Sequence, residues 1–239
     1  MLEIKDYLKR VKSLLFREKK IVMIGDSHVR SYAFNDNFLP IFVGQGKLHN
    51  FLTDDNANRF LKGFTRAFRV INPQKVVLII GEPDTRYCLG AGWLPWESAN
   101  IHLMSDYRKV LDNSTARLYD RLSKLNLVNI EIMCLSIMPT LIEEQNKPIN
   151  YMNYNLKDCF KKSFIDVYSK LDFSTSDLKN TLADNIHMST AIQKNVETEM
   201  LKLGIISKAR YSDSFHYYKA SYIKSKFKYS DRFGCYVFK

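Results

Sequence analysis

The sequence predicts an α/β protein, a three-layer α/β/α sandwich built around a central, parallel, five-stranded sheet. Short apolar runs rich in β-branched residues alternate with segments of helical periodicity along most of the 239 residues. These runs are apolar at nearly every position, which is typical of parallel strands that are buried on both faces. The hydrophobic content of 46% is ample for a core of this size.

Five apolar runs are predicted to form the strands of the sheet. The first three end at or beside a glycine, which permits a tight turn at the carboxyl end of the strand. The fifth run is compatible with a helix or a strand, and its β-branched and aromatic content favours a short strand. The predicted strands cover residues 21–24, 39–43, 76–80, 127–137 and 164–168.

Helical periodicity fills most of the segments between these runs. An amphipathic helix is expected before the first strand, and Gly204 is expected to end the last helix. Residues 88–102 contain two glycines, two tryptophans and a proline, which indicates an excursion over the sheet that could wall a pocket. The predicted helices cover residues 2–17, 54–68, 104–125, 151–162 and 190–203.

The chain is expected to hold one main domain, residues 1–204, and a C-terminal extension, residues 205–239. The extension carries eight Lys or Arg against two Asp, interleaved with ten Tyr or Phe. This composition suits the binding of bases, sugars or an acidic membrane face. It equally suits an extension that packs its aromatic rings on the domain while its lysines face water.

Composition narrows the class of protein further. The net charge of +11 indicates an acidic partner, which could be nucleic acid, anionic lipid or an acidic polysaccharide. No apolar run reaches the length of a membrane span, and we expect a cytoplasmic protein. The four cysteines are scattered without a metal-binding spacing, which favours reduced, structural thiols.

The turn after the first strand carries the first chemical signal, the sequence Gly25-Asp26-Ser27-His28. It places Ser27 at the carboxyl edge of the sheet, where open α/β folds bind ligands. Near the end of the chain, Asp184 and His187 are three residues apart, so that a carboxylate could orient an imidazole as a general base. Each motif alone is also compatible with a capped helix and a surface histidine.

In this order the motifs resemble the SGNH hydrolase superfamily, the GDSL-type esterases and lipases, over roughly residues 20–200. The resemblance implies that Ser27 is the nucleophile, His187 the general base and Asp184 its orienting partner. It also implies that the glycine after the second strand, Gly44 or secondly Gly46, donates a backbone N–H to the oxyanion. No cofactor is implied.

The third block departs from the family pattern. Where the family has Gly-x-Asn-Asp, this chain has Gly81-Glu82-Pro83-Asp84, so the asparagine that donates to the oxyanion is replaced by a proline. Arg86 is our choice for the missing donor, and Gln45, beside Gly44, is the other side-chain donor near these blocks. The sequence is equally compatible with an Arg86 that only forms a structural ion pair. The predicted pocket residues are Asp26, His28, Gln45, Glu82 and Asp84.

The first and third blocks, GDSH and GExDxR, resemble a subgroup associated with bacterial surface-polysaccharide biosynthesis. That resemblance implies a serine-dependent esterase or acyltransferase acting on O-acyl groups, O-acetyl by preference, of a cell-surface carbohydrate. An anionic polysaccharide or an acidic inner-membrane face is then a possible partner of the extension, and nucleic acid is not expected. Hydrolysis and transfer remain open.

Two other hypotheses use the same residues. The first is a non-catalytic module that keeps the pocket and binds an anionic polysaccharide or an acidic membrane, which the missing asparagine favours. The second is a metal site for phosphoester hydrolysis, which the absence of a tight ligand pair such as HxH disfavours. Its candidate ligands are Asp26, His28, Asp84, Asp184 and His187.

Overall fold

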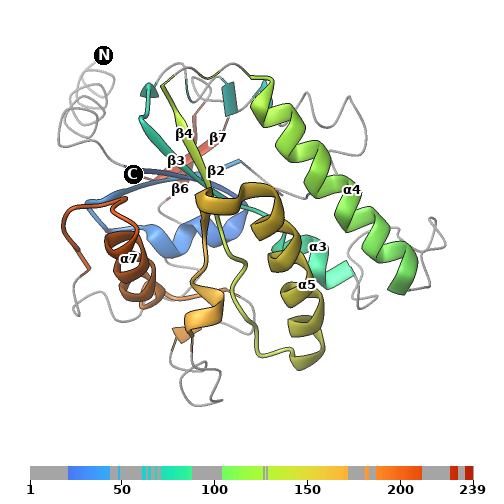
Figure 1. The fold of residues 1–239 in the computed structure, drawn as a ribbon. Helices are drawn as coiled ribbons and strands as arrows, with labels where there is room; N and C mark the ends of the chain where they lie inside the picture. The colour runs from blue at the N-terminus through green and yellow to red at the C-terminus, as the bar shows by residue number, and fades with distance from the viewer. Residues whose placement is uncertain are drawn as a thin grey trace.

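A computed structural model describes the part of the chain that carries the sheet and four α-helices around it (Figure 1). The described residues are 21–43, 48, 61–62, 64–65, 68, 71–87, 104–125, 127, 129–171, 181–182, 187–211, 227–230 and 235–238. The predicted helix 2–17 and the excursion 88–102 lie outside them, as does most of the predicted helix 54–68.

The parallel part of the sheet has the five predicted strands, in the order β5-β4-β3-β1-β2. Strand β1 pairs in parallel with β2 on one side and with β3 on the other, so the strand order reverses at β1. Open α/β sheets bind their ligands at such a switch point, outside the carboxyl ends of the strands. The strands are β1 (Ile21–Gly25), β2 (Phe38–Phe42), β3 (Lys75–Ile79), β4 (Glu131–Leu135) and β5 (Phe164–Ile165).

Two antiparallel strands extend the sheet beyond the predicted five. Strand β7 (Cys235–Phe238) pairs with β2, and β6 (Phe227–Ser230) pairs with β7. Both come from the C-terminal extension, whose alternation of aromatic with other side chains fits a strand as well as a binding surface. Their pairing covers the outer edge of β2, which would otherwise present free backbone groups.

Helices cover both faces of the sheet and complete the three layers. Alternate residues of each strand point to opposite faces, so Val22 and Ile24 belong to one apolar cluster and Ile21 and Met23 to the other. The first cluster is covered by α4 (Met104–Ser123) and α5 (Glu143–Phe160). The second is covered by α7 (Ile192–Lys202) and the short 3₁₀ helix η1 (Ser27–Tyr32).

The helices differ most from the predictions at the start of α5 and directly after β3. Helix α5 begins at Glu143, eight residues earlier than predicted, and contains Pro148 near its start. A proline there removes one hydrogen bond without ending the helix, and it hides the helical pattern in the sequence. The charged residues after β3 form a short helix, α3 (Glu82–Tyr87).

The remaining short helices flank β5. They are the 3₁₀ turns η4 (Lys161–Ser163) and η5 (Tyr168–Lys170).

Gly204 ends the last helix with a φ of 67°, as predicted. Within the described ranges, none of the helices is both long and apolar enough to cross a bilayer.

Candidate active site

The turn after β1 is held tightly against the end of β3. A Cβ added to Gly25 would lie 1.7 Å from the carbonyl oxygen of Ile79, so no other residue fits there without moving the backbone. The backbone N–H of Asp26 donates to the same carbonyl at 3.0 Å. Asp26 then caps η1, because its Oδ1 accepts the backbone N–H of His28 at 2.8 Å. This arrangement fixes Ser27 as the first residue of η1, half-buried at the carboxyl edge of the sheet.

Ser27 and His187 come together although 160 residues separate them. The distance between Ser27 Oγ and His187 Nε2 is 2.8 Å, so the hydroxyl can donate to the imidazole. This is the geometry of a nucleophile and its general base. The predicted pairing of these two residues is therefore present in the structure.

The segment that carries His187 is fastened to the turn that carries Ser27. Ser31 Oγ, on η1, donates to the carbonyl oxygen of Met188 at 2.6 Å. Met188 is buried and forms an isolated antiparallel bridge with Leu182. Met188, the next residue in the sequence, thus anchors the backbone that carries His187 close to the turn of Ser27.

Several predicted site residues lie outside the described part of the chain. Asp184, the predicted orienting carboxylate, and Gly44, Gln45 and Gly46, the predicted oxyanion loop, belong to this group. The backbone of Arg86 lies in α3, but its side chain is not described. Their assignments remain predictions from the sequence.

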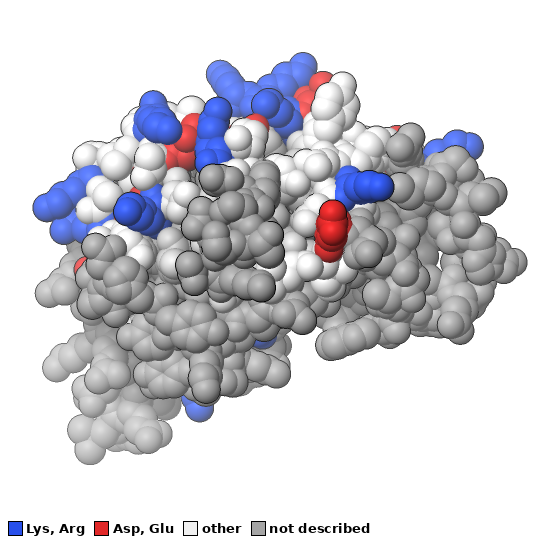
Figure 2. Space-filling model, turned by 90° about the horizontal axis from the view of Figure 1, so that it is seen from below, with Lys and Arg blue, Asp and Glu red and all other residues white. Residues whose placement is uncertain are grey.

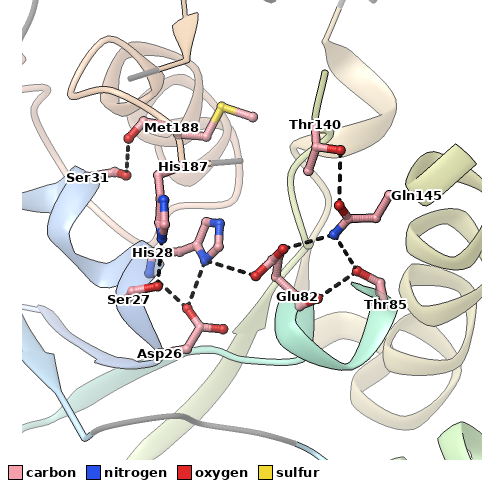
Figure 3. A network of polar contacts seen from close by, with 10 residues as sticks. All are labelled: Asp26, Ser27, His28, Ser31, Glu82, Thr85, Thr140, Gln145, His187 and Met188. Carbon is pink, nitrogen blue, oxygen red and sulfur yellow. Dashed lines mark hydrogen bonds and ion pairs between the residues drawn. The ribbon is translucent and has the colours of Figure 1, made fainter. Parts of the chain in front are cut away.

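A second histidine, His28, packs directly against His187 (Figure 3). The two ring centroids are 4.9 Å apart and the ring planes make an angle of 27°, which is a stacked arrangement. His28 Nδ1 lies 3.0 Å from Asp26 Oδ1 and 3.8 Å from Glu82 Oε2. Asp26 and Glu82 are 1% and 2% exposed, so two buried carboxylates flank one nitrogen of this ring.

Glu82 is in turn held by a chain of polar side chains from α5 and the loop before it. Gln145 Nε2 donates to Glu82 Oε1 and to Thr85 Oγ1, both at 2.9 Å. Thr140 Oγ1 donates to Gln145 Oε1 at 3.3 Å, and Thr85 Oγ1 donates to the carbonyl oxygen of Glu82 at 2.7 Å. Figure 3 shows this chain running away from the serine and the two histidines toward α5. Sequence reasoning missed Gln145, because an isolated glutamine before a predicted helix carries no local signal.

A small pocket lies beside His28, between the ends of β1, β3 and β4. Three predicted pocket residues, Asp26, His28 and Glu82, line it. Apolar side chains make up much of the remaining wall. The other lining residues are Ser31, Tyr32, Ile79, Ile80, Leu135, Ser136, Ile137, Met138 and Met188.

Asp84, the fourth described residue among the pocket predictions, contacts the segment that follows β2. Its Oδ2 accepts the backbone N–H of Leu48 at 2.7 Å, and its side chain is buried. It does not line the described pocket. This hydrogen bond connects α3 to Leu48, in the segment that follows β2.

Burial and the charge of Asp26 shift the pKa values of two side chains on η1, Arg30 and Tyr32. Burial lowers the pKa of Arg30, and the charge of Asp26 partly opposes this shift. Burial raises the pKa of Tyr32, and Asp26 adds to this rise. The Arg30 guanidinium lies 4.7 Å from the centroid of the Phe42 ring, so a cation remains close to the turn.

The metal hypothesis draws no support from the described residues. Among them, no three His, Cys, Asp or Glu side chains are arranged to hold a metal ion. Of its five candidate ligands, Asp84 instead accepts a backbone N–H, and Asp184 is not described.

Comparison with known proteins gives a structural similarity that bears on the fold. No protein-family model matches the sequence, and no curated protein matches it significantly. A crystal structure of a protein from Bacteroides fragilis, provisionally named an acylhydrolase, superimposes with a TM-score of 0.53 at 14% identity. The match covers 80% of this chain and 88% of that one. At this identity the similarity establishes the fold, the three-layer α/β sandwich that the sequence predicts.

Proposed function

We propose that this protein is a serine-dependent acyl-ester hydrolase or acyltransferase of SGNH type. The observation that carries the proposal is the 2.8 Å contact between Ser27 Oγ and His187 Nε2 at the switch point of the sheet. The provisional name of the structural neighbour, an acylhydrolase, supports the same class of reaction. The GDSH and GExDxR blocks favour an O-acyl carbohydrate, with O-acetyl as the preferred group.

The reaction begins with a proton transfer across this contact. His187 Nε2 takes the proton of Ser27 as Oγ attacks the acyl carbonyl, and a tetrahedral intermediate forms. His187 then gives the proton to the departing sugar oxygen, which leaves the acyl group on Ser27. A water molecule or a second sugar hydroxyl attacks this acyl-enzyme, and its proton passes through His187 back to Ser27.

The oxyanion requires donors that are in place before the reaction. The backbone N–H of Ser27 is one, and the sequence predicts that Gly44 supplies a second. Pro83 offers no side-chain donor where the family has asparagine, and losing one donor typically costs about a hundredfold to a thousandfold in rate. We assign the third donation to Arg86, whose position at the fifth residue of α3 follows directly from the block.

A fluorophosphonate probe tests the proposed function. Such a probe labels only a serine that a neighbouring base has activated, so wild type should be labelled and Ser27→Ala should not. Ser123→Ala is a matched control, because this hydroxyl is exposed at the end of α4 and donates to the carbonyl oxygen of Asp120. Equal labelling of wild type and Ser27→Ala would contradict the proposal.

The competing function is a non-catalytic module that binds an anionic polymer. Pro83 in place of the asparagine favours it, and so does the charge. Figure 2 shows that Lys and Arg outnumber Asp and Glu over the described part of one face. Absence of labelling in the folded wild-type protein, together with salt-sensitive binding to an anionic polysaccharide, would select this alternative.

A further inference from the structure

His28 occupies an unusual electrostatic position next to the proposed base. Asp26, at the end of β1, accepts from both its backbone N–H and its ring, and Glu82 approaches the same ring nitrogen from α3. His187 faces the ring from the loop before α7. Arg30, on η1 itself, lies over the ring of Phe42.

The surroundings of Nδ1 favour one protonation state. Nδ1 must carry a proton, because the nearest groups are carboxylate oxygens that only accept. Two buried carboxylates close to one imidazole favour its charged form, since each stabilises the cation. Gln145 keeps Glu82 turned toward this position, because its amide donates to the other carboxylate oxygen at 2.9 Å.

We propose that His28 is a positioning residue that acts through His187 as a permanent imidazolium. Its stacked ring fixes the plane of His187, and its charge disfavours a second positive charge on the neighbouring ring. His187 therefore stays neutral, and able to accept a proton, to a lower pH than it would beside an uncharged side chain at position 28. This inference rests on the proposed function of Ser27 and His187.

The same charge assists the second half of each proton transfer. Once His187 holds the proton of Ser27, two imidazolium rings are stacked, and the proton is released more readily to the departing oxygen. His28 keeps its own proton throughout, so it neither gives a proton to the reacting groups nor takes one from them. The role also gives a reason for the burial of Glu82, from the third block, next to the ring of His28.

The pH dependence of kcat/KM on an acetyl-ester reporter tests this role. In His28→Asn, the acidic limb of the profile should move to higher pH by about one unit, because a charge close to His187 is lost while Asp26 and Glu82 remain. His28→Phe keeps a stacked ring without charge, and should show the same shift with a smaller loss of kcat. Lys124→Gln is the control, because it removes a positive charge from the exposed end of α4. An unmoved limb in both folded variants would overturn the proposal.

The ¹⁵N chemical shifts of the histidine ring nitrogens report the charge of His28 in a measurement that does not depend on catalysis. In wild type at pH 7, both ring nitrogens of His28, assigned by correlation with its own backbone amide, should show the imidazolium signature. Glu82→Gln should lower the pH at which His28 gains its proton, and Glu131→Gln, exposed at the start of β4, should leave it unchanged. A neutral His28 in wild type would overturn the inference even if the histidine variants do not fold. A fully active Ser27→Ala would instead refute the proposed function and leave these spectra interpretable.

Discussion

The turns after β1 and after β3 lie side by side at the switch point, but they use their polar residues differently. The turn after β1 leaves Ser27 half-buried, within reach of both His187 and the solvent. In the turn after β3, Glu82 and Asp84 are buried and each meets another part of the protein. Under the proposed function, one turn presents the reactive hydroxyl, while Glu82 and Asp84 of the other turn hold neighbouring parts of the protein in place. A charged cluster after a buried strand can therefore hold other parts of the protein in place beside such a turn.

The largest effect is expected at the first turn. Ser27→Ala and His187→Ala should each lower kcat on an acetyl-ester reporter by about a thousandfold or more, because each removes one end of the proton transfer. Asp184→Asn should cost less than either, since it only orients the imidazole. Steady-state kinetics on folded variants measure all three, with Ser123→Ala as control. Full activity in His187→Ala would show that the 2.8 Å contact is not the catalytic one.

Arg86 tests whether the turn after β3 also touches the substrate. As an oxyanion donor, Arg86→Met should lower kcat by tenfold or more while the melting temperature stays nearly constant. If the substitution lowers stability and leaves kcat of the folded protein intact, Arg86 belongs with the supporting residues of its turn.

Asp84 should affect stability more than catalysis. In Asp84→Ala the buried N–H of Leu48 loses its acceptor, which typically costs about 1–3 kcal/mol in the free energy of unfolding. Asp84→Asn is the matched variant, because its amide oxygen can still accept this N–H and should retain more of the stability. Urea denaturation compares the two. Equal stability of Asp84→Ala and wild type would contradict the supporting role.

The smallest effect is expected far from both turns, on the C-terminal hairpin. We propose that the extension contacts an acidic polysaccharide or membrane face through lysines such as Lys228, which is exposed on β6. Lys228→Gln should weaken binding to anionic vesicles or polymer severalfold at low salt and very little at high salt. Point substitution is preferable to truncation, because deleting β7 would uncover the edge of β2. Unchanged binding at low salt would argue for a purely structural hairpin.

The sequence was informative where chemistry follows a buried strand. The five parallel strands were predictable from their apolar runs, and Gly204 at the end of α7 from its place after the last helical pattern. The pairing of Ser27 with His187 was predicted from the resemblance of their two motifs to the SGNH family, and the two side chains are in contact.

Three features were not predictable. Strands β6 and β7 come from a segment whose aromatic and basic residues suit a binding surface as well as a sheet edge. The early start of α5 is concealed by Pro148. The link from Glu82 to Gln145 depends on how α5 packs beside α3, and no local pattern encodes that contact.

The central claim is that Ser27 carries the acyl group between the two half-reactions. Rapid acid quenching of the protein with an acetyl-ester reporter, followed by proteolysis and mass spectrometry, measures this directly. The account predicts one acetyl group on the peptide that contains Ser27 in wild type, and none on that peptide in Ser27→Ala. Turnover of the reporter by Ser27→Ala at the wild-type rate, with no acetylated Ser27 in wild type, would contradict it.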